Sequence, residues 1–167
     1  YGQMTAGSFM YIGPQGIVHG TTITLLNAGR LKGLGTNNLK GKAFVTSGLG
    51  GMSGAQAKAL IVTGATGIIA EVDHDAIRQR IADHYIREED VFTDLDSMLT
   101  QFVKSKNAEE ARCFVYQGNI VEVWEKLVFK HIHVELGSDQ TSCHNIDHLG
   151  YCPVECTFEE AKALMDD

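Results

Sequence analysis

Short apolar runs alternate along the chain with longer segments of helical periodicity. The apolar runs cover 43–46, 67–72, 112–116 and 131–136, and the helical segments cover 53–60, 73–85, 95–106 and 119–130. Strands that alternate with helices of about 10 to 15 residues are typical of a parallel sheet covered on both sides. The pattern therefore predicts a doubly wound α/β fold with a mostly parallel sheet.

Further elements are expected at both ends of this pattern. Apolar positions over 16–32 predict a helix that ends at Gly33 or Gly35 and packs on the sheet. Residues 137–157 carry no periodicity, and 158–165 predict a short closing helix. A loop of that length in a compact domain is usually functional. We find no repeat and no Pro-rich linker, so we expect 1–167 to form a single domain.

Composition narrows the class of protein. The chain has 167 residues, with 14 Lys and Arg against 21 Asp and Glu, and its formal net charge is -7. No run of cations is present to contact phosphates, so nucleic-acid binding is disfavoured. The apolar runs fall far short of the ~20 residues that span a bilayer, so we expect no membrane segment. The chain has no initiator Met and no signal-peptide pattern, which suggests a fragment of a longer protein.

A glycine-rich turn is the sharpest local signal. Residues 48–54 read Gly-Leu-Gly-Gly-Met-Ser-Gly and lie between a predicted strand and a predicted helix. Glycines there let a phosphate approach the backbone N–H groups and the positive end of the helix. Glu71 ends the next strand, 21 residues after Gly50, where a carboxylate meets the adenosine ribose in dinucleotide-binding folds. The two features predict a Rossmann-like NAD-binding domain, and the carboxylate disfavours the 2′-phosphate of NADP. The alternative interpretation is a tight connection followed by a solvated acid.

The long loop contains several thiols and imidazoles. Cys143, His144, His148, Cys152 and Cys156 lie close together, but their spacing lacks the paired knuckles of structural zinc sites, so we expect no metal. We expect free thiols in a reducing compartment, by default the cytoplasm. His131 and His133 share one face of a predicted strand and are interpreted as packed side chains rather than catalytic ones.

Taken together, the motifs resemble those of the urocanase family. The resemblance rests on 2–8 (GQMTAGS), 11–21 (YIGPQGIVHGT), 48–56 (GLGGMSGAQ) and 139–142 (DQTS), followed by His144 and Gly150-Tyr151. It runs in order across essentially the whole chain, and the first two blocks are highly specific. It implies the central NAD-binding domain of urocanate hydratase, inserted into a separate core domain of a cytoplasmic enzyme that we expect to be a homodimer when full-length.

The resemblance also implies an activity. Urocanases add water to urocanate to give imidazolone propionate, a step of histidine breakdown. They hold NAD tightly as an electrophile that the substrate ring attacks, rather than as a hydride carrier. The small-molecule substrate is urocanate, and no net change of the cofactor's redox state is required.

The family's cofactor contacts carry over to this chain residue by residue. Gln3 resembles an NAD contact, 51–53 the pyrophosphate turn, Glu71 the ribose acid, and 140–144 with Tyr151 the loop around the nicotinamide. The full set that the resemblance implies is Gln3, Gly50, Gly51, Met52, Ser53, Glu71, Asn119, Ile120, Gln140, Thr141, Ser142, Cys143, His144, Tyr151 and Cys152.

Some positions depart from the family pattern. Bacterial-type members carry Gly at the position of Ser53 and Arg near Ala76, so the adenosine end is expected to be held differently here, with Arg78 as a candidate substitute. Ile120 replaces a small Ala, which leaves a backbone contact intact. The family's later Phe-Gln-Gly-Leu-Pro-type segment with its Cys and the core-domain residues that bind the substrate carboxylate are absent from these 167 residues, so no catalytic residue is assigned and we expect the fragment alone to be inactive.

Two other function classes remain open from the residues. A conventional NAD-dependent oxidoreductase would need a proton-relay group beside the nicotinamide, for which His144 is the candidate. A non-catalytic α/β ligand-binding module would need neither that group nor turnover. Reduction of the nicotinamide on addition of substrate distinguishes the oxidoreductase from a urocanase.

Overall fold

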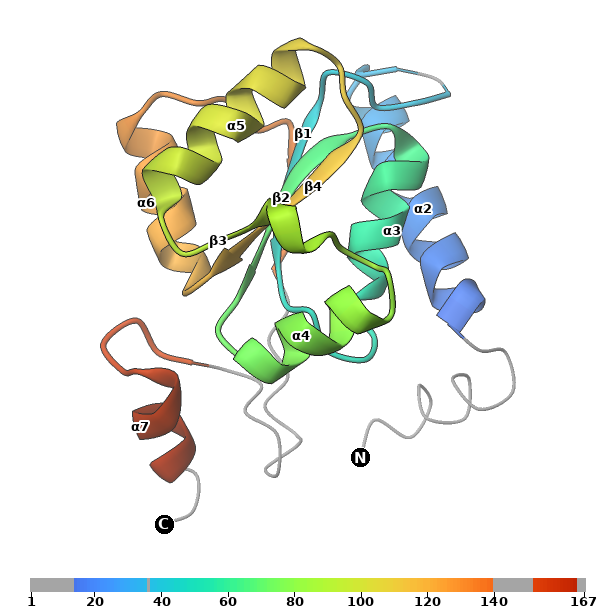
Figure 1. The fold of residues 1–167 in the computed structure, drawn as a ribbon. Helices are drawn as coiled ribbons and strands as arrows, with labels where there is room; N and C mark the ends of the chain where they lie inside the picture. The colour runs from blue at the N-terminus through green and yellow to red at the C-terminus, as the bar shows by residue number, and fades with distance from the viewer. Residues whose placement is uncertain (1–13, 36, 140–151, 165–167) are drawn as a thin grey trace.

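A five-stranded sheet forms the centre of the computed structural model, which describes residues 14–35, 37–139 and 152–164 (Figure 1). The strands are β1 (Ala43–Ser47), β2 (Thr66–Glu71), β3 (Val91–Phe92), β4 (Arg112–Gln117) and β5 (Leu136–Gly137), in the spatial order β3-β4-β2-β1-β5. Every pairing is parallel. The predicted doubly wound α/β fold is confirmed.

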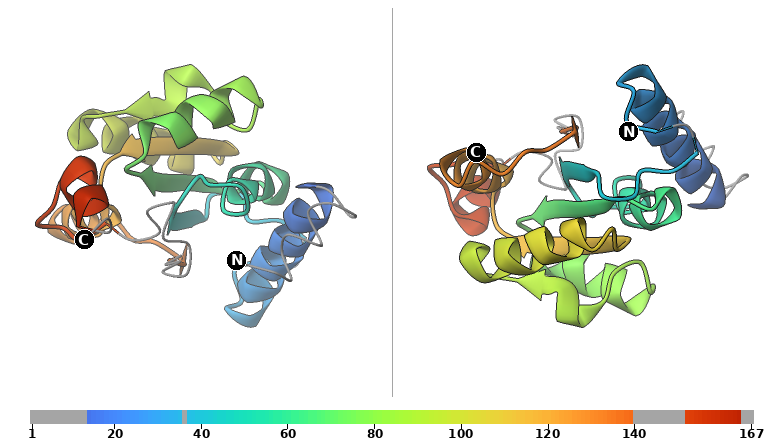
Figure 2. Two further views of the ribbon diagram at one scale, coloured as in Figure 1. Left: turned by 90° about the horizontal axis from the view of Figure 1, so that it is seen from below. Right: turned by 90° about the horizontal axis from the view of Figure 1, so that it is seen from above.

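Helices cover both faces of the sheet. They are α2 (Pro14–Leu31), α3 (Ala55–Thr63), α4 (His74–Ala82), α5 (Leu95–Asn107), α6 (Ile120–Phe129) and α7 (Phe158–Ala163), with a 3-10 turn, η1, at Glu88–Asp90. Figure 2 shows the sheet edge-on, with α3 on one face and α6 on the other. Connections through helices between parallel strands account for this arrangement.

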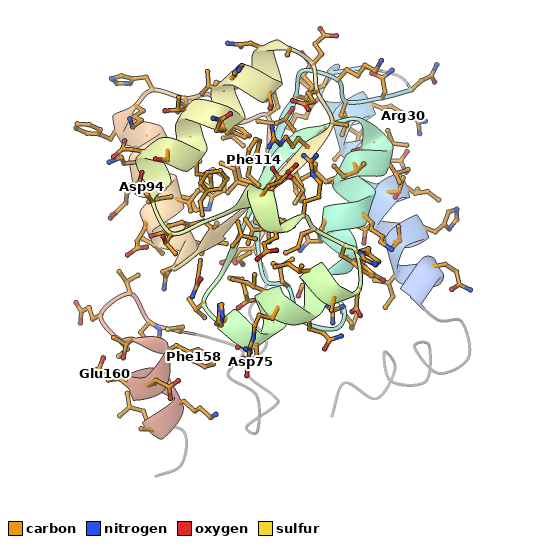
Figure 3. All side chains as sticks on the ribbon, viewed as in Figure 1. Arg30, Asp75, Asp94, Phe114, Phe158 and Glu160 are labelled. Carbon is orange, nitrogen blue, oxygen red and sulfur yellow. The ribbon has the colours of Figure 1, made fainter. Side chains whose placement is uncertain are left out.

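Each face of the sheet has its own core because side chains alternate along a strand. Phe44, Ile69 and Val115 pack with α3 and α4, whereas Val45 and Ile68 pack with α5 and α6. Phe114 lies within the second core, where its ring meets Phe102 edge-on at a centroid distance of 6.2 Å (Figure 3). Strands buried on both faces explain why the sequence shows continuous apolar runs rather than alternation.

Short polar side chains cap the starts of α4, α5, α6 and α7. The carboxylates of Asp73 and Asp94 accept backbone N–H groups at the starts of α4 and α5, and the side-chain oxygen of Asn119 accepts Val121 N–H at the start of α6. These are the residue types preferred at helix N-caps. The cap predicted at Asp73 or Asp75 is confirmed at Asp73.

The predicted strand over 131–136 is wrong in extent. His131, just after the end of α6, has a positive φ of 53°, and β5 begins only at Leu136. Ile132 and Val134 pack against the core of α5 and α6, which explains their alternation without strand pairing. The Glu135 carboxylate instead accepts Ala43 N–H at 2.7 Å, where β1 starts. His131 and His133 therefore do not share a face of a strand.

Two further expectations are corrected. The helix ahead of the first strand, α2, packs on α3 outside the sheet rather than on the sheet itself (Figure 2). The strand β3 was not predicted, because a run of two residues is too short to show a hydrophobic period. It pairs with Val115 and Tyr116 of β4 and forms one edge of the sheet. Within the described residues, no helix is both long and apolar enough to span a bilayer.

The carboxyl ends of the strands meet at one edge of the sheet (Figure 1). The chain runs outward from β1 to β2 on one side, and returns to β5 on the other side of β1. The reversal of strand order therefore lies between β1 and β5. In open α/β sheets, ligands bind in the crevice beyond the carboxyl ends at such a switch point.

Candidate functional site

The glycine-rich turn follows β1 directly at this switch point. Gly48 donates its N–H to Ala70 O at 2.8 Å, and its φ of 90° is one that glycine adopts without strain. A Cβ at Gly48 would also lie 3.0 Å from Ser53 Oγ. The predicted strand, glycine turn and helix are confirmed.

The turn presents an open helix N-terminus. Among residues 14–35, 37–139 and 152–164, no side chain caps α3, whose N-cap is Gly54. In the part of the chain that the structure describes, the N–H groups of Gly51, Met52 and Ser53 donate no hydrogen bond. Gly51 has no atom within 4 Å of an added Cβ, and the Met52 side chain is exposed. Free N–H groups and the helix dipole together favour an anion at this point.

Glu71 lies beside this turn at the end of β2. Its Oε2 accepts Leu49 N–H at 2.6 Å, and its Oε1 accepts Asp73 N–H at 2.9 Å. The carboxylate therefore fixes the turn after β1 to the turn after β2, which excludes the interpretation as a merely solvated acid. A carboxylate has about four acceptor positions, and with the N–H groups of Leu49, Asp73 and Val72 bound to it, acceptor capacity remains for a hydroxyl donor of a ligand.

Burial raises the pKa of the Glu71 carboxyl above its ordinary value of 4.5. The N–H groups of Asp73 and Leu49 oppose this shift, and the negative charge of Asp73 adds to it. The ionised carboxylate is thus under-solvated before a ligand arrives.

A third part of the site joins Asn119 and Cys152, which the resemblance predicted as cofactor contacts. Asn119 Nδ2 donates to Cys152 O at 2.9 Å, which attaches the segment from Cys152 to the start of α6. The Cys152 thiol is half-buried, and its Sγ lies 3.6 Å from Cys156 O and 3.8 Å from Pro153 O, either of which can accept its one hydrogen. Burial raises the pKa of this thiol, and Cys156 adds to the effect. Ile120 packs beside them against the core of α5 and α6.

The fourth part is the chain that leaves β5. Ser47 Oγ donates to the Asp139 carboxylate, and Thr46 Oγ1 lies 2.8 Å from Ser138 Oγ. Ser138 and Asp139 directly precede the predicted loop residues 140–144. Gln3, Gln140, Thr141, Ser142, Cys143, His144 and Tyr151 lie outside the described residues, so their roles stay predictions.

Arg80 places a positive charge near this edge of the sheet, and the sequence analysis did not single it out. It lies in α4, and its Cδ would be 2.8 Å from a Cβ at Gly54. Its guanidinium is 3.2 Å from the Asp83 carboxylate and 5.4 Å from the centre of the Tyr85 ring. Arg78, the predicted substitute near the adenosine end, is exposed and pairs with Asp75, which is labelled in Figure 3. Helical periodicity gave no signal that distinguished the two arginines.

Comparison with known proteins decides the family. Residues 13–167 match the family described as the urocanase Rossmann-like domain. The chain belongs to the urocanase family. It is 57% identical over 166 residues to a probable urocanate hydratase of Dictyostelium discoideum, 52% identical over 170 residues to the urocanate hydratase of Mus musculus, and 51% identical to that of Homo sapiens.

These matches also fix how much of a urocanase is present. Each alignment covers 99% of this chain but 24 to 25% of the relative. The chain therefore spans about a quarter of the length of the urocanate hydratases that it matches. Its Rossmann-like sheet places the glycine turn, Glu71, Asn119 and the end of β5 at one edge.

Proposed function

We propose that this chain is the NAD-binding domain of a urocanate hydratase, a cytoplasmic and homodimeric enzyme of histidine breakdown that converts urocanate to imidazolone propionate. The names of its relatives support the activity. The observation that carries the cofactor is the open start of α3, with Glu71 bound to the same turn.

The residues of the edge fit the parts of NAD in order. The N–H groups of 51–53 fit the pyrophosphate, because three donors without a partner among the described residues meet a helix N-terminus there. The remaining acceptor capacity of Glu71 fits an adenosine ribose hydroxyl. A 2′-phosphate would meet the negative carboxylate, so the fit favours NAD over NADP. Asn119, Ile120 and Cys152 lie at the end of β4 as further contacts.

The nicotinamide half fits the other side of the switch point. The chain leaves β5 through Ser138 and Asp139, and we assign Gln140, Thr141, Ser142, Cys143, His144 and Tyr151 to that half together with Gln3. When bound, NAD would supply an electrophilic ring to the substrate. The task of this chain is then to hold and orient the cofactor and to keep water from it.

A binding experiment tests the cofactor. We expect NAD in the supernatant of the denatured, purified chain, or a thermal shift on adding NAD that NADP gives more weakly. A ligand at a hundredfold excess over its Kd stabilises by about 2.7 kcal/mol. Glu71→Ala should lessen the shift, whereas Asp75→Ala, an exposed acid of α4, should not. Equal shifts with NAD and NADP would contradict the assignment of Glu71.

An exchange of segments tests the activity. The mouse urocanate hydratase carrying this chain in place of its own matching segment should consume urocanate absorbance without accumulating NADH. Accumulation of NADH would favour the oxidoreductase interpretation. Loss of NAD binding together with loss of turnover would overturn the proposed function of this chain.

A further inference from the structure

A polar cluster, two of whose three side chains are buried, lies directly beneath the switch point. It consists of Thr46 on β1, Gln56 in the first turn of α3 and Ser138 just after β5. Thr46 is fully buried and Gln56 is 5% exposed, on the face of the sheet that Phe44 and Leu60 otherwise fill with apolar side chains. Burying polar groups costs free energy unless they are paired, so such a cluster among apolar neighbours requires a reason.

The cluster joins three segments through one carboxamide. Thr46 Oγ1 donates to Gln56 Oε1 at 3.1 Å, and Ser138 Oγ lies 3.4 Å from the same oxygen. Gln56 Nε2 donates to Ser47 O at 3.5 Å. Thr46 and Ser138 lie 2.8 Å apart, and either hydroxyl can donate to the other. The hydrogen bonds therefore link Ser138, Thr46 and Gln56 in one cluster.

These segments carry the two halves of the proposed site. Gln56 belongs to the helix whose N-terminus fits the pyrophosphate, and Ser138 begins the segment that leads to the proposed nicotinamide loop. Among the described residues, β5 pairs with β1 at Leu136 and Gly137, and Ser138 N–H adds a hydrogen bond to Val45 O at 3.0 Å. These contacts join β5 to β1 but not to α3, and Gln56 supplies the contact that joins all three segments.

We propose that Gln56, with Thr46 and Ser138, is a positioning residue that fixes the width and register of the cofactor crevice between β1 and β5. It touches no substrate and acts through the segments that it joins. This inference rests on the proposed NAD-binding function and adds to it the group that holds the two halves of the site in one geometry.

The test separates positioning from stability. Replacing all partners of a hydrogen-bonded cluster by apolar groups of similar shape is nearly neutral for stability. The variant Thr46→Val/Gln56→Met/Ser138→Ala should therefore keep the melting temperature of the wild-type chain, yet its Kd for NAD should rise by on the order of tenfold or more. Thr63→Val is the matched control, because it removes a buried hydroxyl at the other end of α3.

Amide hydrogen exchange tests the coupling of these segments without any ligand. In the triple variant, amides of 47–56 and 136–139 should lose protection together, while those of α5 and β4 stay protected. An unchanged Kd with unchanged exchange would overturn the inference and leave the cluster a packing feature. If the wild-type chain binds no NAD while its exchange shows the coupling, the proposed function fails and the positioning role stands.

A second pair of variants applies if the triple variant does not fold. Thr46→Val removes the hydroxyl with little change of shape, and Thr46→Ser keeps it. We expect Thr46→Ser to retain the wild-type Kd and coupled exchange, and Thr46→Val to lose both. Equal behaviour of the two variants would overturn the inference.

Discussion

Glu71, at the carboxyl-terminal edge of the sheet, both holds the site together and can contact a ligand. Glu71 holds the turn after β1 to the turn after β2 through Leu49 and Asp73, and its remaining acceptor capacity fits a ribose hydroxyl. Its carboxylate is partly desolvated, so hydroxyl donors from a ligand would replace lost water. The same residue thus shapes the site and contributes to recognition.

The pKa of Glu71 predicts how cofactor binding depends on pH. Ribose hydroxyls favour the ionised carboxylate, whose pKa in the free chain is raised above 4.5 by burial. NAD affinity should therefore rise as the pH increases through this raised pKa and then level off. Calorimetric titration of the chain at several pH values measures this, and Glu71→Gln should bind more weakly with a flat profile. A wild-type affinity that falls over the same window would contradict the prediction.

The free energy of unfolding of the ligand-free chain should depend on pH with the opposite sign. Because the pKa in the folded state lies above its unfolded value, ionisation of Glu71 costs more in the folded chain. Its contribution to the free energy of unfolding therefore decreases as the pH rises from the unfolded to the folded pKa.

Reactivity of the thiols should follow burial. Cys113 is 4% exposed on β4, and burial raises its pKa to about 12, with the charge of Asp90 adding to the shift. A thiolate is the reactive form, so iodoacetamide should modify Cys113 only after unfolding. Peptide mass spectrometry of native and denatured samples checks this, with the half-buried Cys156 as the internal comparison. Modification of Cys113 in the native chain would contradict the burial of this strand.

At the scale of elements, close contact between α3 and the sheet fixes the start of α3 near the edge. Gly67 on β2 makes that contact possible, because a Cβ there would lie 1.9 Å from Leu60 Cδ1 and 2.6 Å from Phe44 O. A side chain could be accommodated only by moving α3 away from the sheet.

Gly67→Ala should destabilise the chain by about 2 to 3 kcal/mol, since overpacking of a core costs this much. It should also weaken NAD binding, because α3 shifts. Gly20→Ala is the matched control, for it lies within α2 with no atom near the added Cβ and should stabilise by about 0.5 to 1 kcal/mol. Urea unfolding gives both values, and similar results for the two variants would refute the close packing.

At the scale of the whole molecule, an ion pair connects segments far apart in sequence. Lys106 of α5 lies 3.0 Å from the Glu135 carboxylate and donates to His133 O, while Glu135 accepts Ala43 N–H. Burial alone would raise the pKa of Glu135, but the Ala43 N–H and the Lys106 ammonium outweigh it and lower the pKa. The interaction positions both the start of β1 and the approach to β5.

Lys106→Met should lower the free energy of unfolding by about 2 kcal/mol near neutral pH, between the values for exposed and buried pairs. Because the folded pKa of Glu135 is depressed, its contribution is present above the unfolded pKa and is lost as the pH falls through the folded value. The cost of Lys106→Met should therefore shrink in acid. Lys126→Met, which breaks a more exposed pair with Asp96, should cost about 1 kcal/mol or less. Denaturant unfolding at two pH values checks both variants.

The sequence by itself determined the alternation of β1, β2 and β4 with their helices, because burial on both faces and helical spacing are local patterns. It also located the glycine turn at 48–54 and Glu71, which follows Gly50 by 21 residues. The tertiary structure alone decided what these residues meet: Glu71 binds the turn, Arg80 lies against Gly54, and Gln56 joins Ser138 across 82 residues. It also replaced the predicted strand at 131–136 by the two-residue strand Leu136–Gly137 and added β3. Contacts between distant segments leave no periodic trace in a sequence, so they are fixed only when the sheet brings its strand ends to one edge.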